Sequence, residues 1–361
     1  MKKKILIIVG TRPNFIKVTQ FKKEVESFPN LEVLIAHTGQ HFDDNMSNVF
    51  FEQFQLVPDF FMEVGRDSVC KQIGEIISKM DEIVDDIKPN MIIAVGDVNS
   101  TLCASIVANK RGITLGHLES GLRSLDRSMP EEINRILTDE ITDHFFVTEQ
   151  SGIDNLKADG KSDEVIHFVG NTMIDTLVAF EEKIKASPIL DDLKIQNQEF
   201  ILLTMHRPSN VDDSESLLNV IDLVEKLSKI QKVVFPVHPR TINNLKKNGL
   251  LARFEAIENL IQLPPLDYFG FQNLIANASV VITDSGGIQE ETTFKQVPCI
   301  TIRDNTERPS TIDLGTNELM AFDVDTIVEK VNQSNFKKGS IPPHWDGKST
   351  ARILKIINQI L

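Results

Sequence analysis

Short apolar runs alternate with stretches of helical spacing along this chain, and that alternation limits the fold more than any other feature. Short apolar runs bounded by turn residues are typical of buried strands, whereas helices need longer segments with a period near 3.6. Such alternation predicts a doubly wound parallel sheet with crossover helices. In the first half the expected strands are Lys4–Val9, Glu32–His37, Met91–Val95, Thr114–His117 and His144–Thr148, and the expected helices are Phe15–Glu26, Val69–Ile87 and Ser100–Lys110.

The second half repeats the pattern, and 361 residues are more than one typical core holds. We expect an α/β protein of two doubly wound domains, residues 1–169 and 170–345, with a helix at 346–361 that packs back on the first. Two such domains direct the C-terminal ends of their strands toward a shared cleft, where ligands normally bind. The expected strands are Phe200–Thr204, Val233–Pro236, Leu260–Leu263, Ser279–Thr283 and Cys299–Ile302, and the expected helices are Ser214–Ile230, Tyr268–Asn277, Ile288–Lys295 and Thr350–Leu361.

Charge and composition exclude several classes of partner. The formal net charge is −14 and no basic stripe offsets it, which argues against nucleic acid. No apolar run approaches the ~20 residues that cross a bilayer, and the N-terminal run is too short for a signal peptide, so no membrane partner is expected. Three widely spaced cysteines form neither a disulfide framework nor a metal pair, which favours a reducing cytoplasm.

The segment Thr283-Asp-Ser-Gly-Gly-Ile-Gln-Glu-Glu291 follows an expected strand and opens an expected helix. At such a turn the first helical N–H groups are unpaired and attract anions. Gly286 and Gly287 have no Cβ atom to keep a phosphate away, and a carboxylate such as Glu291 can accept hydrogen bonds from ribose hydroxyls. The pattern favours a nucleotide site, with a plain Gly-Gly turn as the alternative.

Ionisable residues follow three expected strands of the first half. Arg12 and Lys17 lie in Gly10-Thr-Arg-Pro-Asn-Phe-Ile-Lys17, which is neither a dinucleotide fingerprint nor a P-loop; a solvated helix start is the alternative. Asp97 follows the strand at 91–95, where an aspartate often caps the next helix instead. His117, Glu119 and Arg123 gather at the end of the strand at 114–117.

Glu131 lies at an expected helix start after Pro130, and an i,i+4 ion pair with Arg135 is an alternative explanation for it. In the second half, His206 and His238 each follow a strand and are each next to or near an arginine. Structural hydrogen bonding is the alternative for both histidines. Clustering of so many ionisable groups at strand C-termini favours a catalytic site.

Taken together, these motifs closely resemble the non-hydrolysing UDP-N-acetylglucosamine 2-epimerases, from about residue 5 to about residue 320. The resemblance implies the GT-B fold, two Rossmann-like domains with the active site in the cleft between them. It implies reversible C2 epimerisation of UDP-N-acetylglucosamine to UDP-N-acetylmannosamine, for capsule, O-antigen or other surface polysaccharide. It also implies a homodimer that needs no metal and no redox cofactor.

The resemblance further implies roles for individual residues. The catalytic candidates are Asp97, Glu119 and Glu131, which resemble the carboxylates that move protons, and His206, which resembles an assisting histidine. Among the substrate ligands, Glu291 resembles the ribose ligand, Phe271 the aromatic beside uracil, and Lys17 a lysine of the sugar site. Arg12, Ser285, Gly286 and Arg308 resemble the diphosphate ligands, and the remaining substrate-binding candidates are Gln40, Arg135, His238 and Gly287.

Several motifs bear on the branch of the family. Pro13 and Asn14 favour the non-hydrolysing branch, whereas the His206-Arg-Pro-Ser-Asn210 segment departs from members that substrate activates. Segments 38–46 and 123–130 are also similar to epimerases of UDP-2,3-diacetamido-glucuronate, and Arg308 favours the N-acetylglucosamine substrate. A 6-deoxy-N-acetyl sugar, a GT-B glycosyltransferase and a nucleotide-sugar-binding regulator remain alternatives.

Overall fold

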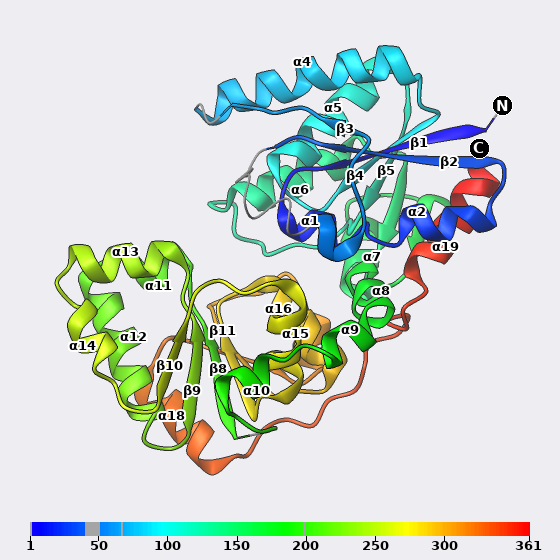
Figure 1. Ribbon diagram of the computed structural model, residues 1–361. Coiled ribbons are helices and arrows are strands. Elements are labelled where there is room, and N and C mark those ends of the chain that lie inside the picture. The colour runs from blue at the N-terminus through cyan, green and yellow to red at the C-terminus, as the bar shows by residue number, and fades with distance from the viewer. Residues whose placement is uncertain (1, 40–50, 66–67, 198) are drawn as a thin grey trace. The chain divides into compact units, whose positions relative to one another are not determined.

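The computed structural model describes residues 2–39, 51–65, 68–197 and 199–361. The chain forms two compact units (Figure 1). The N-terminal unit comprises Met1–Ala179 together with Pro343–Leu361, and the C-terminal unit comprises Phe180–Pro342. The division therefore lies after Ala179, whereas the sequence pattern placed it after residue 169.

A parallel seven-stranded sheet forms the centre of the N-terminal unit, in the order β3-β2-β1-β4-β5-β6-β7. The chain order reverses at β1, which pairs with β2 on one side and β4 on the other. Such a switch point is where open α/β sheets bind ligands. The strands are β1 Lys3–Val9, β2 Leu31–His37, β3 Phe60–Phe61, β4 Met91–Val95, β5 Thr114–Leu118, β6 His144–Val147 and β7 Ile166–Phe168.

Helices follow the strands of this unit. In α4, buried residues recur as Ile76, Met80, Val84 and Ile87, so one face packs on the sheet and the rest meets solvent. The expected helix Phe15–Glu26 is instead two short helices, α1 and α2, with a 3-10 turn at Val25–Ser27. The helices are α1 Arg12–Ile16, α2 Phe21–Glu24, α4 Val69–Ile87, α5 Asn99–Arg111, α6 Pro130–Glu140, α7 Gln150–Ala158, α8 Thr172–Ala179 and α19 Ser349–Ile360.

The final segment of the chain is part of the N-terminal unit. Figure 1 shows α19 beside α2, close to the N-terminal end of the chain. Trp345 is buried and its indole Nε1 donates to the Thr148 carbonyl oxygen at 3.0 Å. Asp175 of α8 accepts the first helical N–H groups of α19, from Ser349 at 3.0 Å and Thr350 at 2.6 Å. This carboxylate from another helix supplies the N-terminal cap of α19.

The C-terminal unit has a parallel six-stranded sheet in the order β10-β9-β8-β11-β12-β13. Its switch point lies at β8, which pairs with β9 and β11. The strands are β8 Phe200–Thr204, β9 Lys232–Pro236, β10 Leu260–Leu263, β11 Val280–Thr283, β12 Cys299–Ile302 and β13 Asn317–Met320.

Helices cover both faces of this second sheet (Figure 1). Because side chains alternate along a strand, Ile201 and Leu203 join the cluster with α12 and α18, whereas Phe200 and Leu202 join the cluster with α15 and α16. The helices are α9 Glu181–Lys185, α10 Ile189–Leu193, α11 Pro208–Val211, α12 Ser214–Leu227, α13 Pro239–Lys247, α14 Leu251–Glu255, α15 Tyr268–Asn277, α16 Gly286–Lys295, α17 Pro309–Asp313 and α18 Val324–Gln333.

The expected fold class, two doubly wound parallel sheets, is confirmed. The sequence pattern missed β3, β7 and β13, all of them short edge strands with only partial burial and thus no continuous apolar run. Within the described residues, no helix combines the length and the apolar character needed to span a bilayer.

Candidate active site

The first cluster lies where β1, β4 and β5 of the N-terminal unit end. Short α1 follows β1, and its Asn14 side chain joins two of these strand ends: Nδ2 donates to the Val95 carbonyl oxygen at 3.1 Å, while Oδ1 accepts from the Thr11 hydroxyl at 2.8 Å. Lys17, at the C-terminal end of α1, is buried and forms an ion pair with Glu119. The contacts therefore fix α1 against the loops that carry the expected carboxylates.

Both loops contain left-handed backbone. Gly96 has a φ of +68°, and a Cβ atom there would lie 2.9 Å from Asn14 Nδ2 and 3.4 Å from Lys17 Nζ. Glu119 has a φ of +70° although it is not glycine. Holding a non-glycine residue in this region costs roughly 1–3 kcal/mol and is concentrated at functional sites. The Glu119 carboxylate points at Lys17, with which it forms the ion pair.

Asp97 forms an ion pair with Arg135 of α6. Arg135 also contacts Glu132, with Nη1 3.1 Å from Oε2. Glu132 is 1% exposed and accepts hydrogen bonds from the Ser124 and Leu125 amides at 2.8 and 3.0 Å. A buried carboxylate thus links the loop after β5 to the arginine that holds Asp97.

Glu131 lies in the first turn of α6, and its side chain is exposed. Arg12, the first residue of α1, is exposed as well. Arg135 forms ion pairs with Asp97 and with Glu132, whereas the i,i+4 spacing suggested Glu131 as its partner. Exposure leaves the side chains of Glu131 and Arg12 accessible to a ligand.

His117 and Asp139 are buried behind this cluster. His117 Nδ1 lies 2.6 Å from Asp139 Oδ1, and Nε2 lies 2.7 Å from the Gly96 carbonyl oxygen. Asp139 Oδ2 accepts from the Gly121 amide at 3.1 Å and from Arg123 Nη1 at 2.7 Å. Burial raises the pKa of Asp139, but His117 and Arg123 together outweigh it and hold that pKa below its ordinary value.

The second cluster lies where β8 and β11 of the C-terminal unit end. Asp284 is fully buried and accepts the His206 and Arg207 amides at 2.9 and 2.8 Å, together with the Asn210 side chain at 3.1 Å. Its other oxygen lies 2.8 Å from His206 Nδ1. Burial raises the pKa of Asp284, whereas the contacts with His206 and Arg207 outweigh it and lower the pKa below its ordinary value. Asp284 therefore fixes the ring of His206, whose side chain is 44% exposed.

His238 stands beside His206, with ring centroids 5.9 Å apart. It caps α13, because its Nδ1 accepts from the Arg240 amide at 3.2 Å. Burial, then the charges of His206 and Arg240, lower the pKa of His238. His238 therefore has a structural role as a cap in addition to its position at a strand end.

Ser285 is the N-cap of α16, and Gly286 and Gly287 form its first turn, as the sequence predicts. Arg308 approaches this turn so closely that a Cβ at Gly286 would lie 2.9 Å from its Nη1. Arg308 forms ion pairs with Glu290, at 2.9 Å, and with Glu307. Glu307 also lies 3.0 Å from Arg303, a buried arginine whose pKa burial lowers. A cation is thus held at the N-terminus of α16, an arrangement suited to an anion.

Three further candidates have different surroundings. Glu291 is buried in α16. Burial lowers the pKa of Lys295, and the charge of Glu291 partly offsets that shift. Phe271 is partly buried and packs against the core cluster of α15 and α16. Gln40 lies outside the described residues. Among those residues, no group of three or more His, Cys, Asp or Glu side chains could hold a metal ion.

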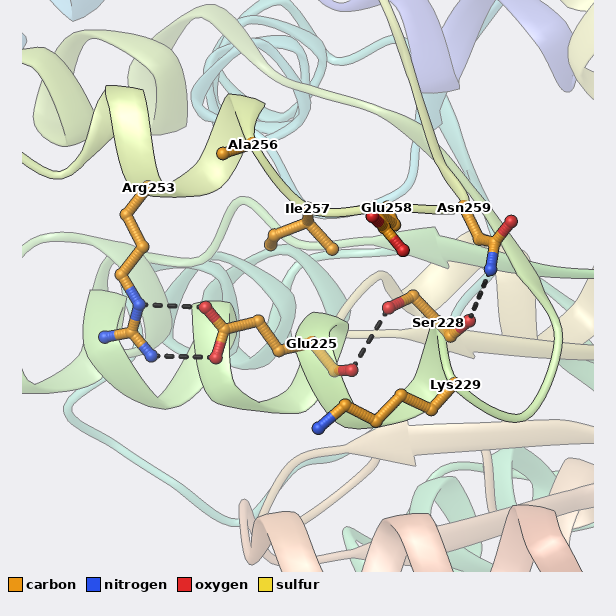
Figure 2. Close-up of a pocket in the computed structure, with 8 residues that line it drawn as sticks. All are labelled: Glu225, Ser228, Lys229, Arg253, Ala256, Ile257, Glu258 and Asn259. Atoms are coloured by element: carbon orange, nitrogen blue, oxygen red, sulfur yellow. Dashed lines mark hydrogen bonds and ion pairs between the residues drawn. The ribbon is translucent and has the colours of Figure 1, made fainter.

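A cavity of about 390 Å³ lies at the opposite edge of the second sheet, near the amino ends of β9 and β10 (Figure 2). Figure 2 shows Arg253 facing Glu225, to which it makes two 2.8 Å hydrogen bonds. None of the expected site residues lines this cavity. Doubly wound sheets normally bind ligands at the carboxyl ends of their strands, which is the edge where the clusters above lie.

A model of the family described as UDP-N-acetylglucosamine 2-epimerase matches residues 23–358. The chain belongs to the UDP-N-acetylglucosamine 2-epimerase family. Members of this family are isomerases, as the resemblance of the motifs implied. A UDP-N-acetylglucosamine 2-epimerase of Methanococcus maripaludis is 37% identical and matches over 98% of each chain.

Two other relatives of this epimerase family bear on fold and substrate. A UDP-2,3-diacetamido-2,3-dideoxy-D-glucuronate 2-epimerase of Pseudomonas aeruginosa is 36% identical, over 92% of each chain. The crystal structure of Methanocaldococcus jannaschii UDP-GlcNAc 2-epimerase in complex with UDP-GlcNAc and UDP matches 99% of each chain, at a TM-score of 0.88 and 34% identity. With its two Rossmann-like units, the chain has the GT-B fold class that the sequence predicted.

Sequence reasoning missed several residues that organise these clusters. Asn14, Glu132, Asp139, Asp284 and Glu307 each connect segments that the sequence pattern considered separately. The available signal was proximity: Asp284 and Glu307 directly precede expected ligands, and Glu132 follows one. Asp139 had no such signal, because it lies 22 positions from His117.

Proposed function

We propose that this member of the family reversibly epimerises UDP-N-acetylglucosamine to UDP-N-acetylmannosamine at C2 of the sugar. The observation that carries the proposal is that two ion pairs lie at one edge of the sheet, Glu119 with Lys17 and Asp97 with Arg135. Epimerisation needs carboxylates that can take and return protons, and both are here held by cations beside the switch point of the sheet. The relatives named above add support.

The chemistry follows from the weak acidity of the sugar C2 proton. Simple deprotonation at C2 is too costly near neutral pH. In the proposed reaction a base removes the C2 proton while the C1–O bond breaks and its electron pair leaves with UDP, so that a 2-acetamidoglucal forms. Protonation of C2 on the opposite face and re-addition of the UDP oxygen to C1 then give the epimer. These steps balance without an oxidant or a reductant.

In this proposal the N-terminal unit handles the sugar. Asp97, Glu119 and Glu131 are the candidates for taking and delivering the protons. The exposed position of Glu131 suits contact with a ligand. Lys17 and Arg135 hold their carboxylates in place and offer cations to the sugar site.

The C-terminal unit is proposed to hold UDP. Ser285, Gly286 and Gly287 form the turn that opens α16, and the guanidinium of Arg308 lies against it. Such a turn stabilises the negative charge that builds up on the departing diphosphate. Glu291 is proposed for the ribose and Phe271 for uracil. His206, oriented by Asp284, is proposed to assist departure of UDP.

A second sugar is also a candidate. The Pseudomonas aeruginosa relative, named for UDP-2,3-diacetamido-2,3-dideoxy-D-glucuronate, is nearly as similar as the Methanococcus maripaludis one. The same elimination and re-addition would serve that sugar, because C2 and C1 carry the reaction in both. The two substrates differ in the groups at C3 and C6.

Incubation in heavy water with a single UDP-sugar and no acceptor tests the reaction. With UDP-N-acetylglucosamine we expect deuterium at C2, a UDP-N-acetylmannosamine signal in the NMR spectrum and no free N-acetylmannosamine. Parallel tubes with UDP-2,3-diacetamido-glucuronate and with a 6-deoxy-N-acetyl sugar identify the preferred substrate. If every sugar stayed undeuterated, the epimerase proposal would be wrong and a glycosyltransferase or a binding protein would gain support.

Three finer features complete the proposal. Reduced cysteines favour action in the cytoplasm, since the chain has three widely spaced cysteines, two of them buried. We further propose a homodimer and a role in precursor synthesis for surface polysaccharide. Sedimentation equilibrium tests the homodimer: a mass near twice 40.6 kDa is expected, and a monomer at all concentrations would contradict it.

A further inference from the structure

His117 and Asp139 are ionisable, completely or almost completely buried, and have no place in the proton transfers above. Their relative exposures are 0% and 1%. Burying such groups is costly unless their hydrogen bonds are satisfied. The partners that satisfy them are two peptide groups, at Gly96 and Gly121, and the guanidinium of Arg123. Those peptide groups directly adjoin the segments that carry Asp97 and Glu119.

The hydrogen-bond partners determine the protons on the His117 ring. Nε2 faces the Gly96 carbonyl oxygen, which can only accept, so Nε2 carries a proton. Nδ1 faces Asp139, whose other oxygen already accepts from two donors and whose pKa is held below its ordinary value. Asp139 is therefore a carboxylate, and Nδ1 must donate to it. The ring then carries both protons and a positive charge.

The first peptide group fixes Asp97. The Gly96 carbonyl belongs to the peptide bond that leads into Asp97, and it accepts from His117 Nε2 at 2.7 Å. The Gly96 amide donates to the Leu118 carbonyl oxygen at 2.9 Å. The N–H and the C=O group of this left-handed glycine are thus both held. The His117 ring therefore fixes the direction of the backbone that leads into Asp97.

The second peptide group fixes the turn after Glu119. The Glu119 amide donates to the Phe146 carbonyl oxygen at 3.0 Å, and the Gly121 amide donates to Asp139 Oδ2 at 3.1 Å. Glu119 lies between these two anchors with its backbone in the left-handed region. A turn with a non-glycine residue in that region persists only where the surroundings hold it. Asp139 therefore holds the turn of Glu119 and, through His117, the peptide of Asp97.

We propose that His117 and Asp139 are positioning residues for both proton-transferring carboxylates, acting as one buried ion pair that fixes the loops after β4 and β5. The proposal rests on the proposed function. Neither residue needs to touch the sugar. Replacing the pair should therefore slow the chemical step and leave the affinity for UDP unchanged.

Two substitutions of His117 separate positioning from mere packing. His117→Phe keeps the ring volume but has no donor for the Gly96 carbonyl, whereas His117→Gln places an amide N–H near the position of Nε2. We expect His117→Phe to lower kcat by about 10²-fold, the effect of a small misplacement of reacting groups. We expect His117→Gln to restore about tenfold of that loss, with KM within about threefold of the parent in both variants.

Asp175→Asn is the matched control, because Asp175 is also buried in the N-terminal unit and also accepts two backbone amides. We expect it to lower the melting temperature about as much as His117→Phe while kcat stays unchanged. A full kcat in His117→Phe overturns the proposal. An equal loss of kcat in Asp175→Asn, or a His117→Gln variant no better than His117→Phe at equal stability, overturns it as well.

Nitrogen-15 NMR of the histidine rings tests the ion pair without substrate, which separates this inference from the proposed function. From the hydrogen-bond geometry we expect His117 to show two protonated ring nitrogens in the parent, and one in Asp139→Asn, where the amide can turn its donor toward Nδ1. A singly protonated ring in the parent, or an unchanged ring in Asp139→Asn, overturns the inference. Absence of C2 exchange in the parent with every UDP-sugar would overturn the proposed function instead.

Discussion

At the scale of single residues, two of the expected catalytic carboxylates, Glu119 and Asp97, each form an ion pair with a cation. Glu119 and Lys17 are both nearly buried, whereas the Asp97 side chain is 24% exposed and its partner Arg135 is buried. Ion pairs with buried members cost desolvation, so stability alone is a poor reason for them. Holding a carboxylate at a fixed place for proton transfer is a better one.

Asp97→Asn tests that explanation. The substitution keeps the shape of the side chain but removes the group that can take or deliver a proton, so C2 deuterium exchange should fall by about 10²-fold or more. Affinity for UDP, measured by calorimetry, should stay at the parental value, because Asp97 is not among the proposed UDP ligands, most of which lie in the other unit. Asp159→Asn, on an exposed part of the same unit, is the control and should exchange normally. Normal exchange in Asp97→Asn would exclude Asp97 from the chemistry.

The pKa of Asp284 predicts a dependence of stability on pH. Because its pKa is lower in the folded protein than in the unfolded chain, Asp284 contributes stability above about pH 4 that is lost as the pH falls through the folded value. Asp284→Asn should lower the free energy of unfolding by about 2 kcal/mol near neutral pH, since several hydrogen bonds to a charged group are weakened. Urea unfolding at neutral and at acidic pH should show the gap to the parent shrinking on acidification. A gap independent of pH would contradict the assignment.

At the scale of elements, the chemistry depends on the loop and the helix that come after each strand. The loops after β4 and β5 reverse direction at Gly96 and Glu119, both left-handed, and α1 and α6 supply the cations that meet them. In the C-terminal unit, the turn after β11 opens α16 while the loop after β12 brings Arg308 to it. Short loops at one edge of a parallel sheet gather residues that are distant in sequence.

Gly96→Ala and Gly112→Ala make a matched pair at this scale. Both glycines have positive φ, +68° and +64°, but a Cβ at Gly96 meets Asn14 and Lys17 whereas nothing lies within 4 Å at Gly112. Each should lose roughly 1–2 kcal/mol of stability from the left-handed backbone. Only Gly96→Ala should also lose kcat, because the added methyl displaces the Lys17–Glu119 pair. Equal kcat values in the two variants would argue against crowding at the site.

At the scale of the whole molecule, the N-terminal unit is discontinuous in sequence. The chain leaves this unit after Ala179 and returns at Pro343, where Trp345 and the buried face of α19 pack on it. The unit therefore needs residues from both ends of the chain to complete its core. Asp175, which caps α19, lies four residues before the point of departure.

Trp345→Ala should therefore destabilise the N-terminal unit although it lies far along the chain from the rest of that unit. Truncating a fully buried tryptophan typically costs about 3–5 kcal/mol, and the indole hydrogen bond to Thr148 is lost as well. Urea unfolding followed by circular dichroism measures the loss. Ile341→Ala, at a position 45% exposed, should change stability by less than about 0.5 kcal/mol. A loss of that small size in Trp345→Ala would show that the returning segment is dispensable.

The sequence by itself determined the two parallel sheets, because continuous apolar runs and helical periodicity depend only on neighbours along the chain. The same local signals placed Ser285, Gly286, Asp97 and Glu119 after strands. Only the tertiary structure decided that Lys17 holds Glu119, that Asp139 anchors both loops through His117, and that α19 completes the first unit. The contact from Asp175 to Thr350 of α19, for example, joins residues 175 positions apart. The energies of such contacts depend on burial and on three-dimensional geometry, which no local pattern encodes.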